Sequence, residues 1–334
     1  MTTQTSGEAV RIGIIGCGDI ARRVHVPALS AAGARVIRFA STDIADAEEA
    51  ARRSGQPDSM TSDEWRHVTA SVHIDAVDIC TPNHLHADMA MAAMETGKHV
   101  LVESPMALTA AQADAMLKVA ARKGVTLVPA MSVRFIGPYA AMIDAARSGA
   151  VGEVRSVEIA FGHHGPERLN PGATWYLDKE KAGGGPLMEL GTSQIDLLRT
   201  ALEREVVQVS AVTLGRRGGV EERAEARLTF EGGASAQLRC GWTGPENLWR
   251  MVGTDGTLEL DASTPPQLVR PDGTSERLAI PEVPSIEGVF VAAVARGEQP
   301  PVTAMDGRAA VAVIEAAYAS SAAGEPVEVT RPAW

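Results

Sequence analysis

The chain has 334 residues, of which 45% are hydrophobic and 22% are charged, and its formal net charge is -11. This length exceeds the size at which one hydrophobic core stops growing, so two domains are expected. Nucleic acids and anionic membranes bind basic protein surfaces, so the net negative charge argues against either as a partner.

Cysteines are few and scattered, at Cys17, Cys80 and Cys240. Their odd number and the lack of a Cys-x-x-Cys pair argue against a disulfide framework or a zinc site, so we expect no bound metal and a reducing compartment. No run approaches the ~20 apolar residues of a membrane-spanning helix. The first ten residues lack the basic flank and apolar run of a signal peptide. A cytoplasmic protein is expected.

The first apolar run, residues 10–15, is short and β-branched, which is typical of a buried parallel strand. It leads into Gly16-Cys17-Gly18-Asp19-Ile20-Ala21, and a helical pattern follows to about residue 32. This is the G-x-G-x-x-A form of the dinucleotide fingerprint in its strand-to-helix context. Gly16 permits the tight turn, Gly18 lets the backbone approach a pyrophosphate, and the helix start offers N–H groups to phosphate. We expect Gly16, Gly18, Asp19 and Ile20 to bind a dinucleotide cofactor.

Strands and helices then alternate up to residue 130. This pattern predicts a doubly wound parallel sheet, whose ligands bind at the carboxyl ends of the strands. The expected strands are residues 35–40, 74–80, 99–102 and 126–130, and the expected helices are residues 44–53, 87–96 and 110–123.

Polar residues follow two of these strands. The expected cofactor-contacting residues at these strand ends are Thr81, Pro82, Asn83, His84, Glu103 and Ser104. His86 is explained equally well as a residue that caps the loop.

The end of the second strand should indicate which cofactor is used. An acidic residue there binds the ribose of NAD, whereas an arginine accommodates the extra phosphate of NADP. The chain has Ser41-Thr42-Asp43 at this point. Ser41 and Thr42 are expected to contact the cofactor, and the choice between NAD and NADP stays open.

From Met131 the pattern changes to period-two strands separated by glycine-rich turns, which predicts a largely antiparallel open sheet. The expected strands are residues 155–161, 206–214, 225–230, 234–242 and 257–260, and the expected helices are residues 139–148 and 309–323. The predicted fold class is α/β. It has a Rossmann domain over residues 1–130, a doubly wound parallel sheet, and a C-terminal α+β domain over residues 131–334.

Two further motifs complete a pattern: Glu103-Ser104-Pro105 after a strand, and Gly183-Gly184-Gly185-Pro186-Leu187-Met188-Glu189-Leu190-Gly191-Thr192-Ser193-Gln194-Ile195-Asp196. With the fingerprint, they resemble the Gfo/Idh/MocA family of NAD(P)-dependent oxidoreductases from residue 10 to about residue 329. The resemblance implies NAD or NADP as cofactor, a small-molecule substrate, and a homodimer or homotetramer. It also implies cofactor contact by Arg134, in the crossover between domains, and packing of the 309–323 helix against the C-terminal sheet.

The chain departs from the family pattern at the proton relay. The family usually has Glu-Lys-Pro where this chain has Glu103-Ser104-Pro105, so Ser104 takes the position of the lysine. It usually has an aspartate at the position of Glu189 and a histidine at the position of Ser193. The resemblance therefore implies a site with Ser104, Glu189 and Ser193 and without either relay group of adjustable pKa. Each serine also has a plain structural explanation, as does Asp196, which we expect to be a structural or helix-surface acid.

Replacement groups are available nearby. His163 and His164 follow an expected strand, and Tyr176 lies on a loop that in the family closes over the substrate. Solvent exposure explains the paired histidines equally well. The favoured hypothesis is oxidation or reduction of a sugar, cyclitol or related hydroxyl or ketone, with Glu189, Tyr176 or His164 handling the proton.

Two alternatives remain open at this point. One is a catalytically degenerate protein that binds a nucleotide or sugar. The other is a lyase or hydrolase that uses bound NAD without net redox. A non-redox enzyme without cofactor is disfavoured by the intact Gly16 to Gly18 turn.

Overall fold

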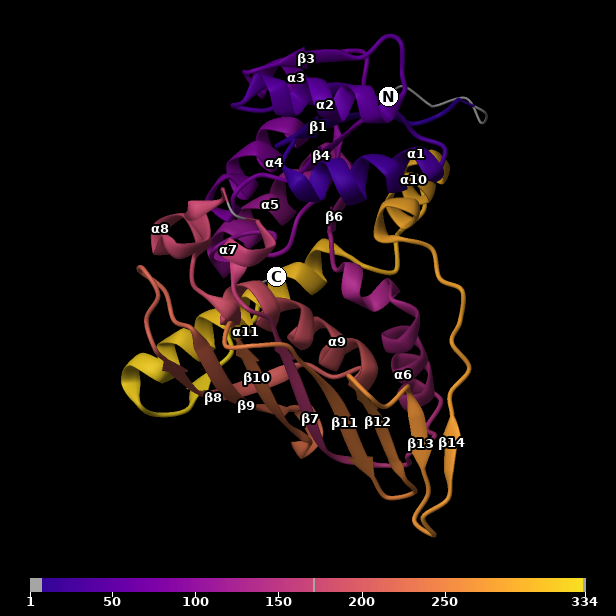
Figure 1. The fold of residues 1–334 in the computed structure, drawn as a ribbon, viewed down its shortest axis with the longest axis vertical. Helices are drawn as coiled ribbons and strands as arrows, with labels where there is room; N and C mark the ends of the chain where they lie inside the picture. The colour runs from indigo at the N-terminus through magenta and orange to yellow at the C-terminus, as the bar shows by residue number, and fades with distance from the viewer. Residues whose placement is uncertain (1–7, 171, 333–334) are drawn as a thin grey trace. The chain divides into compact units, whose positions relative to one another are not determined.

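The computed structural model describes residues 8–170 and 172–332. The expectation of no signal peptide falls mainly on residues 1–7 and lies outside the described residues. By its internal contacts the chain divides into two compact units (Figure 1). The first combines the chain up to Ala130 with Pro284–Arg308, and the second combines Met131–Val283 with the chain from Ala309 onward.

The first unit contains a six-stranded parallel sheet in the order β3-β2-β1-β4-β5-β6. The reversal of strand order at β1 and β4 is that of a doubly wound Rossmann sheet, so the predicted fold class is confirmed. The central strands are apolar and buried on both faces, as parallel strands require. The strands are β1 (Arg11–Ile15), β2 (Arg35–Ala40), β3 (Met60–Ser62), β4 (Ala76–Ile79), β5 (His99–Val102) and β6 (Leu127–Pro129).

Helices join these strands, and their ends follow the sequence. Asp43 caps α2, accepting a hydrogen bond from Ala45 N, and Thr109 caps α5, accepting one from Gln112 N. Both helices end at a left-handed glycine, Gly55 and Gly124. The elements are π-helix η1 (Ala21–His25), α1 (Val26–Ala31), α2 (Ile44–Ser54), α3 (Arg66–Thr69), 3₁₀ helix η2 (Asn83–Leu85), α4 (His86–Glu95), α5 (Ala110–Lys123) and α10 (Ile286–Arg296).

The chain returns to the first unit over Pro284–Arg308, a segment that the sequence placed in the second domain. The first division by internal contacts falls after Ala130, and the return of the chain over Pro284–Arg308 was not expected. Helix α10 contacts α1 and β5 and buries Ile286, Val289 and Phe290. An apolar helix needs a partner surface, and amino-acid pattern alone does not say which sheet supplies it.

The second unit contains a nine-stranded sheet in the order β14-β13-β12-β11-β7-β10-β9-β8-β15. Its neighbouring strands are antiparallel except β7 and β10, which are parallel, so the expected largely antiparallel sheet is confirmed. The strands are β7 (Val154–Gly162), β8 (Val206–Leu214), β9 (Arg223–Phe230), β10 (Ser235–Gly241), β11 (Glu246–Gly253), β12 (Thr257–Asp261), β13 (Gln267–Val269), β14 (Ser275–Arg277) and β15 (Val327–Glu328).

The helices of this unit include two that matter for the site, η5 and α9. Helix α11 begins in the first unit and continues into the second, where Ser320 and Ser321 accept hydrogen bonds from Ala211 N and Thr213 N of β8, each at 3.0 Å. The expected packing of this helix on the sheet is confirmed. The remaining elements are η3 (Ser132–Phe135), α6 (Gly137–Arg147), α7 (Pro166–Leu169), η4 (Thr174–Leu177), α8 (Lys179–Ala182), π-helix η5 (Leu187–Gly191), α9 (Thr192–Leu202), η6 (Glu231–Gly233) and α11 (Ala304–Ala323).

Candidate active site

The turn after β1 has the geometry that a phosphate loop requires. Gly16 has φ +88, and a Cβ there would lie 2.7 Å from Cys80 O, so both conformation and space demand glycine. A Cβ on Gly18 would meet nothing within 4 Å, which leaves room over the backbone for a ligand. Ala21 is fully buried at the start of η1. The loop therefore fits a bound pyrophosphate.

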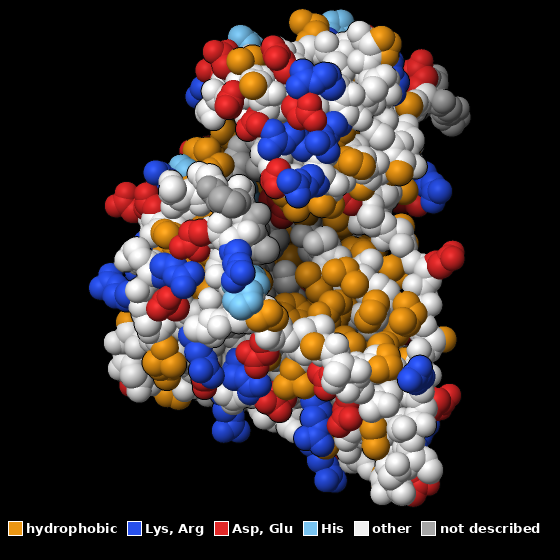
Figure 2. Space-filling view, viewed as in Figure 1, with side chains coloured by type: hydrophobic (Ala, Val, Ile, Leu, Met, Phe, Trp, Pro, Cys, Tyr) orange, Lys and Arg blue, Asp and Glu red, His pale blue; other side chains and the backbone are white. Residues whose placement is uncertain are grey.

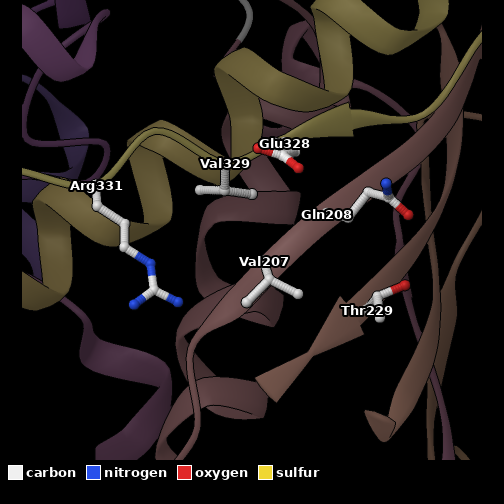
Figure 3. A pocket seen from close by; sticks show the side chains of 6 residues that line it. All are labelled: Val207, Gln208, Thr229, Glu328, Val329 and Arg331. Carbon is white, nitrogen blue, oxygen red and sulfur yellow. The ribbon is translucent and has the colours of Figure 1, made fainter. Parts of the chain in front are cut away.

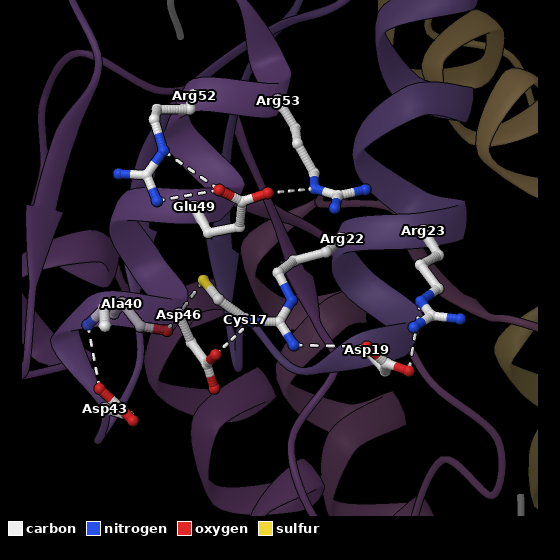
Figure 4. Close-up of polar contacts among 11 residues, drawn as sticks. Cys17, Asp19, Arg22, Arg23, Ala40, Asp43, Asp46, Glu49, Arg52 and Arg53 are labelled. Atoms are coloured by element: carbon white, nitrogen blue, oxygen red, sulfur yellow. Dashed lines mark hydrogen bonds and ion pairs between the residues drawn. The ribbon is translucent and has the colours of Figure 1, made fainter. Parts of the chain in front are cut away.

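Charged side chains beside this loop are paired with one another (Figure 4). Arg22 contacts both Asp19 and Asp46, and Arg23 Nε lies 3.3 Å from Asp19. Figure 2 shows the same intermixing of acidic and basic side chains on the face of the first unit that carries α2. The basic groups near the loop are therefore partly neutralised before any phosphate arrives.

The segment after β2 is open for a ribose. Ser41 is half-buried, and Thr42 and Asp43 are exposed. The carboxylate of Asp43 is committed to Ala45 N at 3.0 Å, as the cap of α2. Asp46 stands in the first turn of the same helix. Two carboxylates at this helix start disfavour an additional phosphate.

The strand ends of β4 and β5 carry the other expected cofactor residues. Thr81 and Pro82 are half-buried, and Asn83 begins η2. His84 Nδ1 is buried and has no hydrogen-bond partner among the described residues. Glu103 and Ser104 follow β5.

His86 belongs to the fold rather than to solvent. Its ring lies between Thr81 O at 2.7 Å and Pro105 O at 2.8 Å, and the side chain is fully buried. Burial lowers the pKa of His86, against the opposing effect of the two carbonyl acceptors. The loop-capping interpretation describes these contacts well, because the ring joins the two loops that follow β4 and β5.

In the second unit, the triple glycine is held by Glu221. The carboxylate of Glu221 accepts hydrogen bonds from Gly185 N at 2.9 Å, Leu187 N at 3.1 Å and the Tyr318 hydroxyl at 3.0 Å. A Cβ on Gly184 would overlap the Tyr318 hydroxyl, and one on Gly185 would lie 2.1 Å from Glu221 O. The glycines therefore allow a buried carboxylate to fix the start of η5.

Glu189 lies in η5, a π-helix, an element that occurs often at functional sites. Its Oε2 accepts a 2.6 Å hydrogen bond from Trp242 Nε1 and lies 3.2 Å from His163 Nε2. Gly165 N donates to His163 Nδ1 at 3.0 Å, so the proton of the ring is on Nε2, which donates to Glu189. Both contacts use Oε2, and the side chain is 26% exposed, which leaves Oε1 for a substrate group.

Ser193 and Asp196 follow on α9 with different surroundings. Ser193 is half-buried. Asp196 is 1% exposed and forms a buried ion pair with Arg134. Asp196 is therefore the expected structural acid, inside the unit and not on a helix surface. The pair also occupies the guanidinium of Arg134, the residue for which we expected cofactor contact.

The sequence singled out His164, but the structure brings its neighbour His163 to Glu189. His164 is exposed, and Tyr176 is half-buried and stacks on Trp175 with ring centroids 3.8 Å apart. His163 and Trp242 directly follow Gly162 and Gly241, which pair across the parallel strands β7 and β10. This pairing places both residues at the carboxyl ends of two neighbouring strands. It involves strands distant in the sequence, and for this reason Trp242 was missed and the contact of His163 with Glu189 was not predicted.

The three cysteines are free, as the sequence predicted. Burial raises the pKa of the Cys17 thiol to about 12, and it also raises the pKa values of the Cys80 and Cys240 thiols. They are therefore thiols at neutral pH and poor nucleophiles.

A hollow of about 470 Å³ lies elsewhere, on strands β8, β9 and β15 (Figure 3). Its one arginine, Arg331, pairs with Glu231 at 2.6 Å. None of the candidate residues lines it. Its lining consists of Val207, Gln208, Thr229, Glu328, Val329 and Arg331. In the part of the chain that the structure describes, none of the helices has the length and apolar character needed to cross a membrane.

A Rossmann unit with a phosphate loop, followed by a mixed-sheet unit with a partly exposed carboxylate, is typical of a two-domain nucleotide-dependent oxidoreductase. Residues 10–131 match the oxidoreductase family with an NAD-binding Rossmann fold, and residues 139–259 match the GFO/IDH/MocA C-terminal domain. The chain belongs to the Gfo/Idh/MocA family of NAD-binding oxidoreductases.

Characterised relatives cover most of the chain. The D-xylose 1-dehydrogenase (NADP(+)) 2 of Haloferax volcanii is 30% identical over 330 residues, 95% of this chain and 99% of that protein. The 1,5-anhydro-D-fructose reductase of Ensifer adhaerens is 30% identical over 254 residues, 74% of each chain. The crystal structure of an aldose-aldose oxidoreductase from Caulobacter crescentus with glycerol superposes with a TM-score of 0.86 at 26% identity, covering 96% of this chain and all of that one. These similarities support the enzyme hypothesis. They lend no support to a catalytically degenerate binding protein, or to a lyase or hydrolase that uses NAD without net redox.

Proposed function

We propose that this protein oxidises or reduces a sugar or a related hydroxyl or ketone compound with NAD or NADP, and that Glu189 accepts or returns the proton. The observation that carries the proposal is the geometry of Glu189, whose Oε2 is held by Trp242 and His163 while Oε1 takes no part in either contact. The named substrates of the relatives, D-xylose and 1,5-anhydro-D-fructose, support the sugar class.

The cofactor would be held by groups of the first unit. Gly16 makes the tight turn, with its N–H donated to Ala40 O, Gly18 leaves the backbone open to the pyrophosphate, and Ser41 and Thr42 contact the ribose next to adenine. Thr81, Pro82, His84, Glu103 and Ser104 line the other half. The nicotinamide ring supplies the hydride acceptor or donor.

Glu189 performs the proton transfer in this account. In the oxidation direction, Oε1 of its carboxylate takes the proton of the substrate hydroxyl. The carbon that bears this hydroxyl loses a hydride to the nicotinamide. Two N–H donors on Oε2 orient the carboxylate. His163 and Trp242 are therefore positioning residues, and solvent removes the proton from the partly exposed side chain.

The remaining candidates keep supporting roles in the proposal. Ser104 and Ser193 provide hydroxyl groups for hydrogen bonds to substrate in place of the usual lysine and histidine. Tyr176 and His164, on the segment after β7, are candidate second proton donors. These roles rest on the family resemblance and on residue type.

The first test is cofactor binding followed by turnover. NADH and NADPH are titrated against the purified protein, with fluorescence transfer and thermal stabilisation as readouts. Turnover is then measured over a panel of aldoses, 1,5-anhydrosugars and cyclitols, with Ser104→Lys as a comparison. Failure of both cofactors to bind would end the proposal, and binding without turnover of any panel member would argue against the sugar class.

A further inference from the structure

Three carboxylates, those of Asp78, Glu103 and Glu287, surround His25 inside the first unit. His25 Nδ1 lies 2.9 Å from Asp78 Oδ2 and 3.8 Å from Glu287 Oε1, and His25 Nε2 lies 2.7 Å from Glu103 Oε1. His25, Asp78 and Glu287 are each at most 2% exposed. The groups come from η1, β4, the end of β5 and α10. A buried cluster drawn from four separate elements is a costly arrangement.

The contacts define the charge of the ring. Both ring nitrogens face carboxylate oxygens, which only accept, so His25 donates from both and is an imidazolium. Burial is the largest single effect and lowers the pKa of His25, but Asp78 and Cys80 together outweigh it, and the pKa is well above its ordinary value. Cys80, whose sulfur lies 3.7 Å from Asp78 Oδ1, has a thiol pKa that burial raises. The imidazolium of His25 is therefore shared by three buried or half-buried carboxylates.

Glu103 connects this cluster to the loop after β5. Its Oε1 binds His25, and its Oε2 accepts a 2.8 Å hydrogen bond from Ser104 N. The carbonyl of the following residue, Pro105 O, is bound by His86 at 2.8 Å. The backbone on both sides of Ser104 is thus fixed by histidine contacts. Serine carries its hydroxyl on Cβ, so the placement of that hydroxyl depends on the backbone.

Sheet order indicates which half of the cofactor this loop faces. The pyrophosphate sits at the turn after β1, and the ribose next to adenine lies toward β2. In the order β3-β2-β1-β4-β5-β6, the strands β4 and β5 lie on the opposite side of β1 from β2. The nicotinamide half therefore extends over the carboxyl ends of β4 and β5, where Ser104 stands.

We infer that His25 is a positioning residue, which acts through Glu103 to hold the Ser104-Pro105 loop against the nicotinamide half of the cofactor. The inference rests on the use of NAD or NADP but not on the role of Glu189. It predicts an effect on the cofactor before any chemistry takes place.

Two amide substitutions test the contacts of the two ring nitrogens of His25 separately. In His25→Gln the side-chain amide reaches the position of Nε2 and preserves the contact to Glu103, whereas in His25→Asn it replaces Nδ1 and preserves the contact to Asp78. The control is His99→Asn, which alters another largely buried histidine at the opposite end of β5, where His99 Nδ1 accepts from Thr126 N. A second route to the same contact is Glu103→Gln, which leaves one carbonyl oxygen for two donors.

The first readout is hydrogen exchange of the Ser104 amide in the cofactor-free protein. The second is the ratio of the dissociation constants for NADH and ADP-ribose, which lacks the nicotinamide. We expect His25→Asn and Glu103→Gln to speed the exchange and to raise the ratio by about tenfold, with a clearly smaller change in His25→Gln and none in His99→Asn.

Equal effects of His25→Gln, His25→Asn and His99→Asn would overturn the inference, as would parallel weakening of NADH and ADP-ribose. Both results describe a merely structural histidine. If the unmodified protein bound neither compound, the cofactor assignment itself would fall, whereas binding without a change in the ratio overturns the positioning role alone. Loss of Glu189-dependent turnover has no bearing on either readout.

Discussion

The indole N–H of Trp242 donates a 2.6 Å hydrogen bond to Oε2 of Glu189. Trp242 is 2% exposed and directly follows the last residue of β10, while Glu189 lies in η5 after the triple glycine. A buried donor that reaches a partly exposed carboxylate orients it at small entropic cost, because the tryptophan is already fixed by packing. The same oxygen meets His163, so the two donors define which oxygen is left for substrate.

Trp242→Phe tests this contact. The change keeps an aromatic ring and removes the N–H, so we expect kcat to fall about tenfold with a small change in cofactor affinity. Trp249→Phe is the matched control, because Trp249 is also buried and its Nε1 has no partner among the described residues. Steady-state kinetics of both variants decide the matter. An equal loss in the two variants would show that packing, and not the hydrogen bond, matters.

Asp46 should limit the use of NADP. Asp46→Ala removes one negative charge at the start of α2 and releases Arg22 from that pairing. We expect the KM for NADP to fall relative to that for NAD by about threefold to tenfold. Glu48→Ala, an exposed acid on the same helix, removes the same charge without touching Arg22. A similar shift in both variants would assign the effect to net charge alone.

Glu221 should support the fold around the triple glycine. Glu221→Gln leaves one acceptor for three donors, so we expect the free energy of unfolding to fall by about 1–3 kcal/mol. Tyr318→Phe removes only one of these hydrogen bonds and should cost about 1 kcal/mol. Urea unfolding measures both values. If Glu221→Gln were as stable as the unmodified protein, the three contacts would not fix η5.

The His25 cluster gives a pH dependence of stability with a defined sign. The folded-state pKa of His25 is raised, so its contribution is complete below the unfolded value of about 6.5 and is lost as the pH rises through the folded value. Burial is the largest single effect on the pKa of Glu103 and raises it, but His25, the Ser104 N–H and His86 together outweigh burial and the pKa is lowered, so the contribution of Glu103 is lost as the pH falls below about 4.5.

The stability difference between the unmodified protein and His25→Gln should therefore be larger at pH 6 than at pH 9. Chemical unfolding at the two pH values provides the comparison. A difference that stayed constant or grew toward pH 9 would contradict a protonated His25.

Most of the Rossmann unit could be predicted, because its buried strands are apolar runs and both α2 and α5 have capping residues. Strand β3 and helix α3 were not predicted, because both are short and mostly polar. The prediction for β2 coincides with the observed Arg35–Ala40, and that for α5 with Ala110–Lys123. Strand β11, with the sequence ENLWRMVG, was missed because its charged and apolar residues do not alternate cleanly. The partner surface of α10 was not predictable, since an apolar helix face fits either sheet.

The candidate site could be predicted only in part, for the same physical reason. Glu189 was identified through its motif, which is local in sequence. His163 and Trp242 depend on the parallel pairing of β7 with β10, and His25 on contacts with β4, β5 and α10. Partners of this kind come from strand order and tertiary packing, which one sequence does not reveal.

The most direct test of the central claim is a single-turnover measurement of the nicotinamide absorbance change with a sugar substrate, comparing the unmodified protein with Glu189→Gln. Glutamine keeps the shape of the side chain but cannot accept a proton at Oε1, so the account predicts a rate lower by about 100-fold or more with unchanged NADH affinity. Glu180→Gln, an exposed acid of the same unit, serves as the control. Equal rates in Glu189→Gln and the unmodified protein would contradict the role of Glu189.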